Sequence, residues 1–401
     1  MDFQAAEIHR FVQENREEAI DCLRELLATP SNSGEEVAVS KVFCRWIERA
    51  GLEPTVVGIS EEHPNVLAEW FGSNPGKRFV FNGHMDTFPP TDGDEGTYGP
   101  YSGMVADNAV YGRGASDMKG GDAAALMAVA FLKRMGFDPK GSVLLSYLCD
   151  EELGGRYGSK WLAPRGYLDG DFGICMEQTD SRILIGHSGM FRIYVIYHAP
   201  AQHSARPHTK KKPLENAVIA INELYTYRDQ VVRKKKDPIY ESSSLEITMM
   251  NAGAAPNVHA AEARFAIDYR MIPSETLEEV SRAIFGILDA LKMADPDMDY
   301  EYELISDRPG LSVDEKSDIV RACKEAYEEV TGKPAEVFYR HGGSDAATIQ
   351  KFNNIPMPNW CFAVTAYVGL PDERFDIDDY LLNIEAVSYT HLRAHETKAN
   401  L

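Results

Sequence analysis

Apolar positions recur with the period of a helix in two segments near the start of the chain. In residues 17–28, EEAIDCLRELLA, the aliphatic side chains fall on one helical face and acidic residues open the segment. A second amphipathic pattern covers residues 35–50 and ends at Gly51, a residue that favours a helix end. The apolar runs that follow are expected to be strands, at residues 54–59, 65–71 and 78–83.

Helix and strand patterns then alternate up to about Thr179. A glycine turn, GRGASDMKGG, leads into a long Ala/Leu-rich helix. Apolar runs at residues 142–148 and 172–177 are expected to be strands on either side of a short helix near Lys160. This alternation predicts an α/β layered domain.

The elements change order in the middle of the chain. From residue 181 to residue 307 the patterns follow the order β-α-β-β-α-β, which is typical of a small antiparallel sheet with two helices on one face. The first kind of alternation resumes after about Pro309. We therefore expect a small α+β domain inserted in a larger α/β domain, and 401 residues are enough for both.

Composition narrows the possible partners and location. The 62 Asp and Glu against 41 Lys and Arg give a net charge of -21, which argues against nucleic acid or an anionic membrane and favours a small molecule. Six cysteines without a CxxC pair are expected to be thiols in a reducing compartment. The first residues, MDFQAAEIHRFV, lack an apolar signal region, so we expect a cytoplasmic protein.

Chemically reactive side chains follow the predicted strands. The run FNGHMDTFPP ends a strand with His84 and Asp86, which point the same way because they are two residues apart. A histidine that binds a metal ion is commonly oriented by a carboxylate on its second nitrogen, a role open to Asp86. Taken alone, the pair is more typical of an ordinary strand end than of a metal site.

Asp117, in GRGASDMKGG, precedes the long helix. It is suited to bridging two cations, and the glycines around it would let the backbone pack closely against such a site. The simpler alternative is a helix N-cap. A phosphate-binding loop is a third possibility, but the spacing is not GxGxxG and a carboxylate would repel the anion.

Two further strands end in acidic residues. Asp150, Glu151 and Glu152 follow one strand, and they repel one another unless a cation or a proton offsets their charge. Glu177 ends the next, where a solvated turn residue is the alternative. Because ligands collect at the carboxyl ends of strands in α/β sheets, these ends together favour a metal-dependent active site, with one of the neighbouring glutamates as ligand and the other as general base.

The motifs GHMDTFP, GRGASDMKGG, DEELGG and CMEQTD resemble those of the M20 metallopeptidases in order and spacing. That family includes acetylornithine deacetylase, succinyl-diaminopimelate desuccinylase, aminoacylase and carboxypeptidase G2. The resemblance covers nearly the whole chain, through HSARPH, ENAV, NVH, DYR, GGSDA and PDERFDIDDY. It implies a zinc-peptidase-like α/β catalytic domain, residues 1–180 and 308–387, and an inserted ferredoxin-like α+β lid and dimerisation domain, residues 181–307.

The resemblance also implies roles for the acidic residues. One zinc ion would be held by His84, Asp117 and Glu177, and a second by Asp117, Glu152 and a histidine near the C-terminus. Glu151 would be the general base that takes a proton from a metal-bound water, and Asp86 would orient His84. Cobalt or manganese would also suit these ligands.

Three residues of the inserted domain match family positions that contact the substrate. His203 matches a histidine that crosses to the partner subunit of a homodimer and stabilises the oxyanion. Asn257 and Arg270 match substrate-binding positions, and Arg270 suits a carboxylate. Without the resemblance, His203 is typical of a surface loop and Arg270 of a salt bridge.

One family position is not matched. The C-terminal histidine ligand stands two residues before the proline of a segment like HTPDE, and here that position is Gly369, in YVGLPDERFD. A glycine offers no side-chain ligand, so the second metal site is in question. His341, in RHGGSDA, is an alternative ligand if its loop lies nearby.

The last residues depart from the family pattern. From about Ser388, SYTHLRAHETKANL resembles the translated read-through of a sequencing adapter, so we expect residues 388–401 to be non-native. His391 and His395 are therefore not taken as ligands.

The sequence thus predicts a metal-dependent hydrolase that cleaves the amide bond of a small N-acyl amino acid or short peptide. Two alternatives remain at this point: a di- or aminopeptidase of the same family, and a binding homologue without a complete metal site.

Overall fold

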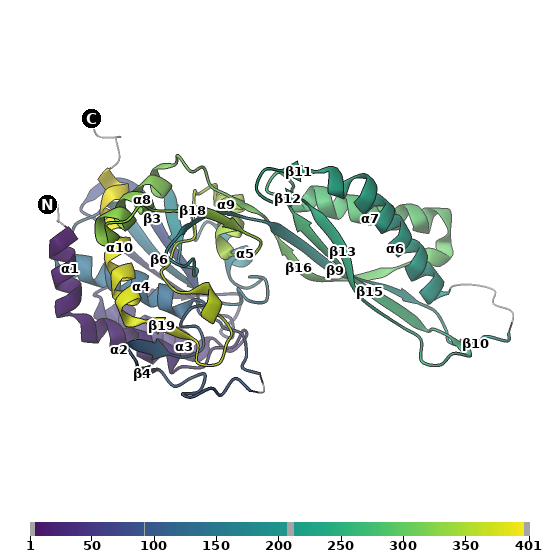
Figure 1. Ribbon diagram of the computed structural model, residues 1–401, viewed down its shortest axis with the longest axis horizontal. Helices are drawn as coiled ribbons and strands as arrows, with labels where there is room; N and C mark the ends of the chain where they lie inside the picture. The colour runs from purple at the N-terminus through teal and green to yellow at the C-terminus, as the bar shows by residue number, and fades with distance from the viewer. Residues whose placement is uncertain (1–4, 92, 207–211, 397–401) are drawn as a thin grey trace. The chain divides into compact units, whose positions relative to one another are not determined.

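The computed structural model describes residues 5–91, 93–206 and 212–396, with side chains through residue 390. The chain forms two compact units (Figure 1). Unit 1 comprises the chain up to Gly186, Ser312–Tyr339 and the residues from Ser344 onward, and unit 2 comprises His187–Leu311 and Arg340–Gly343. The predicted α/β domain interrupted by a smaller α+β domain is confirmed.

A mixed five-stranded sheet forms the centre of unit 1. Its strand order is β1-β2-β6-β3-β7, and β6, β3 and β7 run parallel. The strands are β1 (Pro54–Val57), β2 (Asn65–Phe71), β3 (Asn74–His84), β6 (Lys140–Leu148) and β7 (Phe172–Cys175). The carboxyl-terminal halves of the three parallel strands are buried, as expected of strands covered on both faces. Their carboxyl ends lie along one edge of the sheet.

Helices cover this sheet. The buried helix α4 (Lys119–Arg134) lies against β3 and β6, and α2 (Arg16–Leu27), α3 (Val37–Arg49) and α10 (Ile377–Glu396) pack on it. Helix α9 (Asp345–Asn353) contacts β3 and β7. The remaining helices of unit 1 are α1 (Ala5–Glu14), α5 (Ser159–Leu162) and α8 (Asp318–Thr331).

Two small sheets complete this part of the chain. One has the order β19-β5-β4 and the other β17-β8-β18. Their strands are β4 (Met104–Ala106), β5 (Ala109–Tyr111), β19 (Arg374–Asp376), β8 (Ile183–His187), β17 (Leu311–Ser312) and β18 (Val337–Arg340).

Unit 2 is a four-stranded antiparallel sheet with two helices on one face (Figure 1). The strand order is β13-β15-β9-β16, from β9 (Gly189–His198), β13 (Ser244–Ala252), β15 (Glu262–Met271) and β16 (Glu301–Arg308). Alternate side chains of β9 and β15 form one core with helices α6 (Pro213–Gln230) and α7 (Leu277–Ala294). A capping box between Thr276 and Glu279 starts α7.

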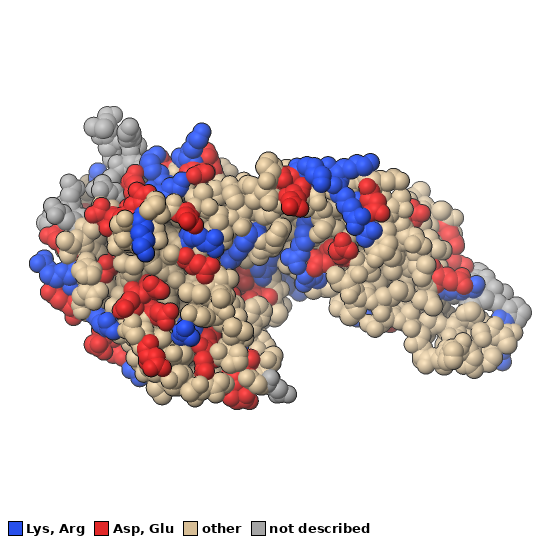
Figure 2. All heavy atoms as spheres, in the orientation of Figure 1, with Lys and Arg blue, Asp and Glu red and all other residues tan. Residues whose placement is uncertain are grey.

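Short strand pairs extend unit 2. Strand β10 (Gln202–His203) pairs with β14 (Val258–His259), and β11 (Lys236–Asp237) pairs with β12 (Glu241–Ser242). On the face shown in Figure 2, basic side chains gather near β11, while acidic and basic side chains are interspersed over unit 1.

All six cysteines are free thiols, and five of them are buried. Among the described residues, none of the helices combines the length and the apolar character that crossing a bilayer requires. Helix α10 continues over Ser388 and Thr390, whose side chains are buried. Whether residues from 388 onward are native stays a prediction; residues 397–401 and the side chains of His391 and His395 lie outside the described set.

The glycine pair in the first turn of α4 brings this helix close to the end of β7. A Cβ atom on Gly121 would lie 2.1 Å from the main-chain oxygen of Met176, and one on Gly120 would lie 2.2 Å from that of Ala115. Only glycine permits this approach, which places the start of α4 beside the strand ends.

We predict that Gly121→Ala destabilises the protein by about 1–3 kcal/mol, because the added methyl group overlaps backbone that cannot move freely. Gly286→Ala is the matched control. Gly286 is an exposed glycine within α7 whose Cβ would meet nothing within 4 Å, and alanine there should stabilise the helix by about 1 kcal/mol. Denaturant unfolding measures both changes, and equal effects would contradict the close approach.

Candidate metal centre

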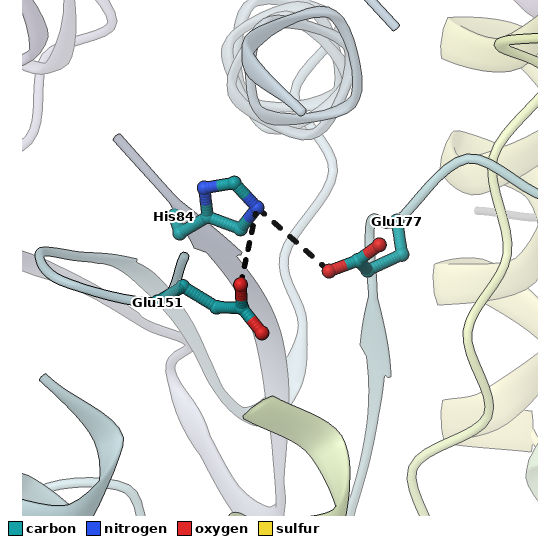
Figure 3. Close-up of side chains that lie close together, drawn as sticks. All are labelled: His84, Glu151 and Glu177. Carbon is teal, nitrogen blue, oxygen red and sulfur yellow. Dashed lines mark ion pairs between the residues drawn. The ribbon is translucent and has the colours of Figure 1, made fainter. Parts of the chain in front are cut away.

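The carboxyl ends of β3, β6 and β7 bring the predicted site residues together. In the strand register His84 lies opposite Leu148 of β6, and Asn82 lies opposite Cys175 of β7. Glu177 follows Cys175 by two residues and therefore reaches the level of His84. Figure 3 shows Glu151 and Glu177 directed toward the imidazole of His84.

The imidazole of His84 is buried and faces carboxylates with its Nε2 atom. That atom lies 3.2 Å from Asp117 Oδ1, 3.8 Å from Glu177 Oε1 and 4.0 Å from Glu151 Oε2. On the other side, Nδ1 lies 2.9 Å from the main-chain oxygen of Asp86 and 3.5 Å from its Oδ1. A carbonyl oxygen only accepts hydrogen bonds, so Nδ1 carries a hydrogen, and in the neutral ring Nε2 keeps a lone pair for a cation.

Two sets of side chains bring ligand atoms within 4.8 Å of one another. One consists of His84, Glu151 and Glu177, and the other of His84, Asp117 and Glu152. All four predicted metal ligands occur in these sets. The predicted trio of His84, Asp117 and Glu177 is divided between them, although both acids lie near Nε2 of the histidine.

The chemistry of this cluster fits a bound cation. Burial, together with the charge of Asp117, raises the pKa of Glu152 to about 11. Burial disfavours the charged form of His84, but hydrogen bonds to Asp117 and Asp86 outweigh it and hold the histidine pKa well above its usual value. Glu152 Oε1 is buried without a hydrogen-bond partner. A divalent cation would supply the missing partner and offset the repulsion.

Two buried carboxylates fix the acidic loop after β6. Asp86 Oδ1 accepts from the main-chain N–H of Glu151 (3.0 Å), and Oδ2 accepts from the N–H of Glu152 (3.1 Å) and from Ser33 Oγ (2.7 Å). Glu36 Oε1 accepts from the N–H of Asp150 (3.1 Å). Each of three consecutive amides is therefore held by a carboxylate. Asp86 thus positions the loop that carries the predicted base as well as contacting His84.

Asp117 lies just before α4 and does not cap it. The helix begins at Lys119, and the N-cap, Met118, makes no side-chain capping bond. The Asp117 carboxylate instead contacts His84 through Oδ1 and accepts from the Gln178 amide through Oδ2 (3.2 Å). Its main-chain N–H donates to Glu373 Oε1 (3.2 Å).

Gly369, where the family ligand is missing, and the alternative ligand His341 lie in different surroundings. Gly369 has φ +70°, and its N–H donates to Glu373 Oε2 (3.3 Å). His341 belongs to unit 2, where its ring packs edge-on against Tyr240 at 5.5 Å between centroids. His341 is in neither of the two ligand sets found among the described residues.

The sequence model of peptidase family M20/M25/M40 matches residues 80–392, most of the chain. The chain belongs to this family. As an M20 hydrolase it is a metal-dependent enzyme that cleaves amide bonds, which confirms the predicted fold class and enzyme class.

Several relatives of this M20 hydrolase are desuccinylases. The succinyl-diaminopimelate desuccinylase of Paracoccus denitrificans (strain Pd 1222) is 29% identical over 347 residues, 80% of this chain and 84% of the relative. That of Gluconobacter oxydans (strain 621H) is 29% identical over 349 residues, 83% and 86% of the two chains. Human carnosine dipeptidase 1 has the same fold, with a TM-score of 0.72, 17% identity and coverage of 98% and 99%.

A dipeptidase of Saccharomyces cerevisiae is also similar in structure, with a TM-score of 0.75, 17% identity and coverage of 99% and 100%. At this identity the two solved structures establish the fold of the M20 hydrolase and no more.

The predicted substrate residues lie at two places in unit 2. The Asn257 side-chain amide lies 3.4 Å from His203 Nε2, where β10 meets β14. Arg270 lies near the far end of the ten-residue strand β15, roughly 30 Å long. Its Nε lies 3.0 Å from Asp268 Oδ1, in a salt bridge. The structure therefore brings His203 and Asn257 together and leaves Arg270 apart from them.

Sequence patterns missed four buried polar residues around the centre of this M20 hydrolase: Glu36, Asp122, Gln178 and Glu373. Asp122 had a readable signal, because a lone acid in an Ala-rich apolar helix is unusual; it lies against Gly83, behind His84, and burial raises its pKa well above the ordinary value. Glu36 resembled an ordinary acid in a helix start. Gln178 and Glu373 lie within the recognised motifs CMEQTD and PDERFDIDDY, but those motifs carry no signal of the contacts that the two residues make.

We predict that Glu36→Ala lowers kcat by about 10- to 100-fold with little change in bound metal. The N–H of Asp150 loses its acceptor in this variant, so the loop that carries the predicted base, Glu151, moves. Glu36→Gln keeps an acceptor oxygen and should restore most of the rate. Steady-state kinetics with elemental analysis measure both effects.

Glu35→Ala is the control, since Glu35 is the exposed neighbour and contacts Asn32 rather than the loop. A Glu36→Ala enzyme with unchanged kcat would show that Asp86 alone holds the loop.

Proposed function

We propose that this M20 hydrolase removes the acyl group from a small N-acyl amino acid, with Glu151 as the general base. The observation that carries this proposal is the position of Glu151. Its Oε2 lies 4.0 Å from His84 Nε2, and its main-chain N–H is fixed by Asp86. A carboxylate held this way beside a cation site is suited to moving protons.

His84, Asp117, Glu152 and Glu177 would hold the cation, zinc by our proposal, and when bound it would supply polarisation of the amide carbonyl and acidification of a water molecule. Glu151 takes the proton from the attacking water and delivers it to the leaving nitrogen. Asp117, Glu152 and Glu177 bind and offset the positive charge. Asp86 keeps His84 and Glu151 in fixed positions relative to each other. Cobalt and manganese are the alternatives to zinc, since imidazole and carboxylates accept all three.

The relatives support an N-acyl substrate. The desuccinylases named above match the chain at 29% identity, whereas the dipeptidases share 17%. An N-succinyl amino acid is therefore the first substrate to test. The dipeptidase alternative requires a free α-amine next to the cleaved bond, and a panel of N-succinyl, N-acetyl and unblocked dipeptide substrates separates the two activities.

We further propose that the enzyme is a homodimer in which His203 and Asn257 serve the partner's site. The N–H of Ala205 donates to His203 Nδ1 (3.1 Å), so the hydrogen of the neutral ring lies on Nε2. The Asn257 side-chain N–H lies 3.4 Å from this Nε2 and is also a donor, so the two N–H groups are not partners of each other but are suited to stabilising one developing oxyanion together. Arg270 would bind the substrate carboxylate from its separate place on β15, after exchange of its partner Asp268. The free thiols support the cytoplasmic location expected from the sequence.

A binding homologue without catalysis is the less favoured alternative. Gly369 supports the binding homologue, because the histidine ligand of the family is missing at this position. The four acids around His84 and the fixed position of Glu151 speak against it, since a binding protein has no use for a positioned base.

We predict that Glu151→Gln lowers kcat by about 10²- to 10⁴-fold, because the general base is lost while the shape of the side chain is kept. Bound metal should stay near the wild-type amount, measured by elemental analysis of the same samples. Glu151→Ala should behave in the same way.

Glu62→Gln, which changes an exposed carboxylate of unit 1, should leave both quantities unchanged. Normal turnover in Glu151→Gln would exclude Glu151 as the base. Loss of metal together with turnover would instead make Glu151 a ligand, as its grouping with His84 and Glu177 permits.

A further inference from the structure

Position 369 lies near the backbone of Asp117, the residue that the family resemblance makes a bridging ligand. Glu373 is buried, and its carboxylate accepts hydrogen bonds from the main-chain N–H groups of Asp117 and Gly369, one on each oxygen. The two residues are therefore held at opposite sides of a single carboxylate group. A side chain at position 369 would start close to the Asp117 loop, where a second cation would need a ligand.

The space at this position is open. A Cβ atom on Gly369 would have a single neighbour within 4 Å among the described atoms, Arg113 Nη1 at 3.5 Å. That guanidinium is buried and paired with Glu373 and Asp94. The two carboxylates offset the charge of Arg113, so what position 369 lacks is a ligand side chain.

The Oδ2 atom of Asp117 accepts a hydrogen bond from a side-chain amide rather than facing His84. Gln178 is buried, and its side-chain Nε2 donates to Asp117 Oδ2 at 3.2 Å, while Oδ1 faces His84. A bridging carboxylate gives one oxygen to each of two cations. Here one oxygen faces the His84 side and the other is satisfied by an amide, which carries no charge.

We propose that this enzyme works with one cation, bound at His84, and that the Gln178 amide takes the place of a second cation on Asp117. Glu152 and Asp117 alone would offer a second cation only two side chains. The inference rests on the proposed function, because it concerns the number of cations in the proposed active site. It goes beyond that function by naming Gln178 and Gly369 as the residues that limit the site to one cation.

Counting bound cations tests the proposal without measuring activity. Chelator-treated protein is dialysed against buffered Zn²⁺ or Mn²⁺ over a range of free concentrations, and the metal per chain is measured by elemental analysis. We expect one equivalent in the wild-type protein, with a second binding at least about 100-fold more weakly. The Gly369→His/Gln178→Ala variant should bind two, because it gains a ligand and frees Asp117 Oδ2.

Leu370→His is the matched control, because it adds the same imidazole at the exposed neighbouring position and should still bind one cation. Thermal unfolding verifies that each variant is folded. If the double variant does not fold, the single variants Gly369→His and Gln178→Ala are measured in its place. Two tight equivalents in the wild type would overturn the proposal and leave the proposed function intact. A folded double variant that still binds one would overturn the assignment to these two residues.

No bound metal in the wild type would overturn the proposed function itself. The two failures are therefore distinguishable in one experiment.

Discussion

The active end of this protein depends on the burial of several carboxylates around one imidazole. Asp117, Glu151 and Glu177 all place an oxygen within 4.0 Å of His84 Nε2, and Glu152 lies in the same cluster. Buried carboxylates in such contact cannot all remain ionised without a compensating positive charge. A cation supplies that charge, and the proposed chemistry uses the same cation to activate the substrate.

Three features of the fold hold these carboxylates together although their negative charges repel one another. Parallel pairing of β3 with β6 and β7 places three acidic strand ends on one edge. The glycine pair at the start of α4 lets the helix approach closely, and so brings Asp117 beside that edge. Asp86 and Glu36 then accept hydrogen bonds from three consecutive amides of the acidic loop, which fixes the backbone of the proposed base, Glu151.

Much of this was predictable from local patterns. Apolar runs with terminal acids predicted the strand ends, and the order of elements predicted an inserted α+β unit. Contacts between distant segments were not predictable. The bond from Glu36 to the amide of Asp150 joins residues 114 positions apart, and the Gln178–Asp117 contact joins residues 61 apart. Such contacts depend on strand register and side-chain direction, and a motif records neither.

Proton release on metal binding tests the central claim most directly. Titration calorimetry of the chelator-treated protein with Zn²⁺ at pH 8, repeated in buffers of different ionisation enthalpy, counts the protons released per cation. Hydrogen bonds to Asp117 and Asp86 raise the pKa of His84, and burial with the charge of Asp117 raises that of Glu152, so protons on these ligands compete with a cation. We expect about one proton or more per cation. Binding without proton release would contradict a cation that compensates the buried acids around His84.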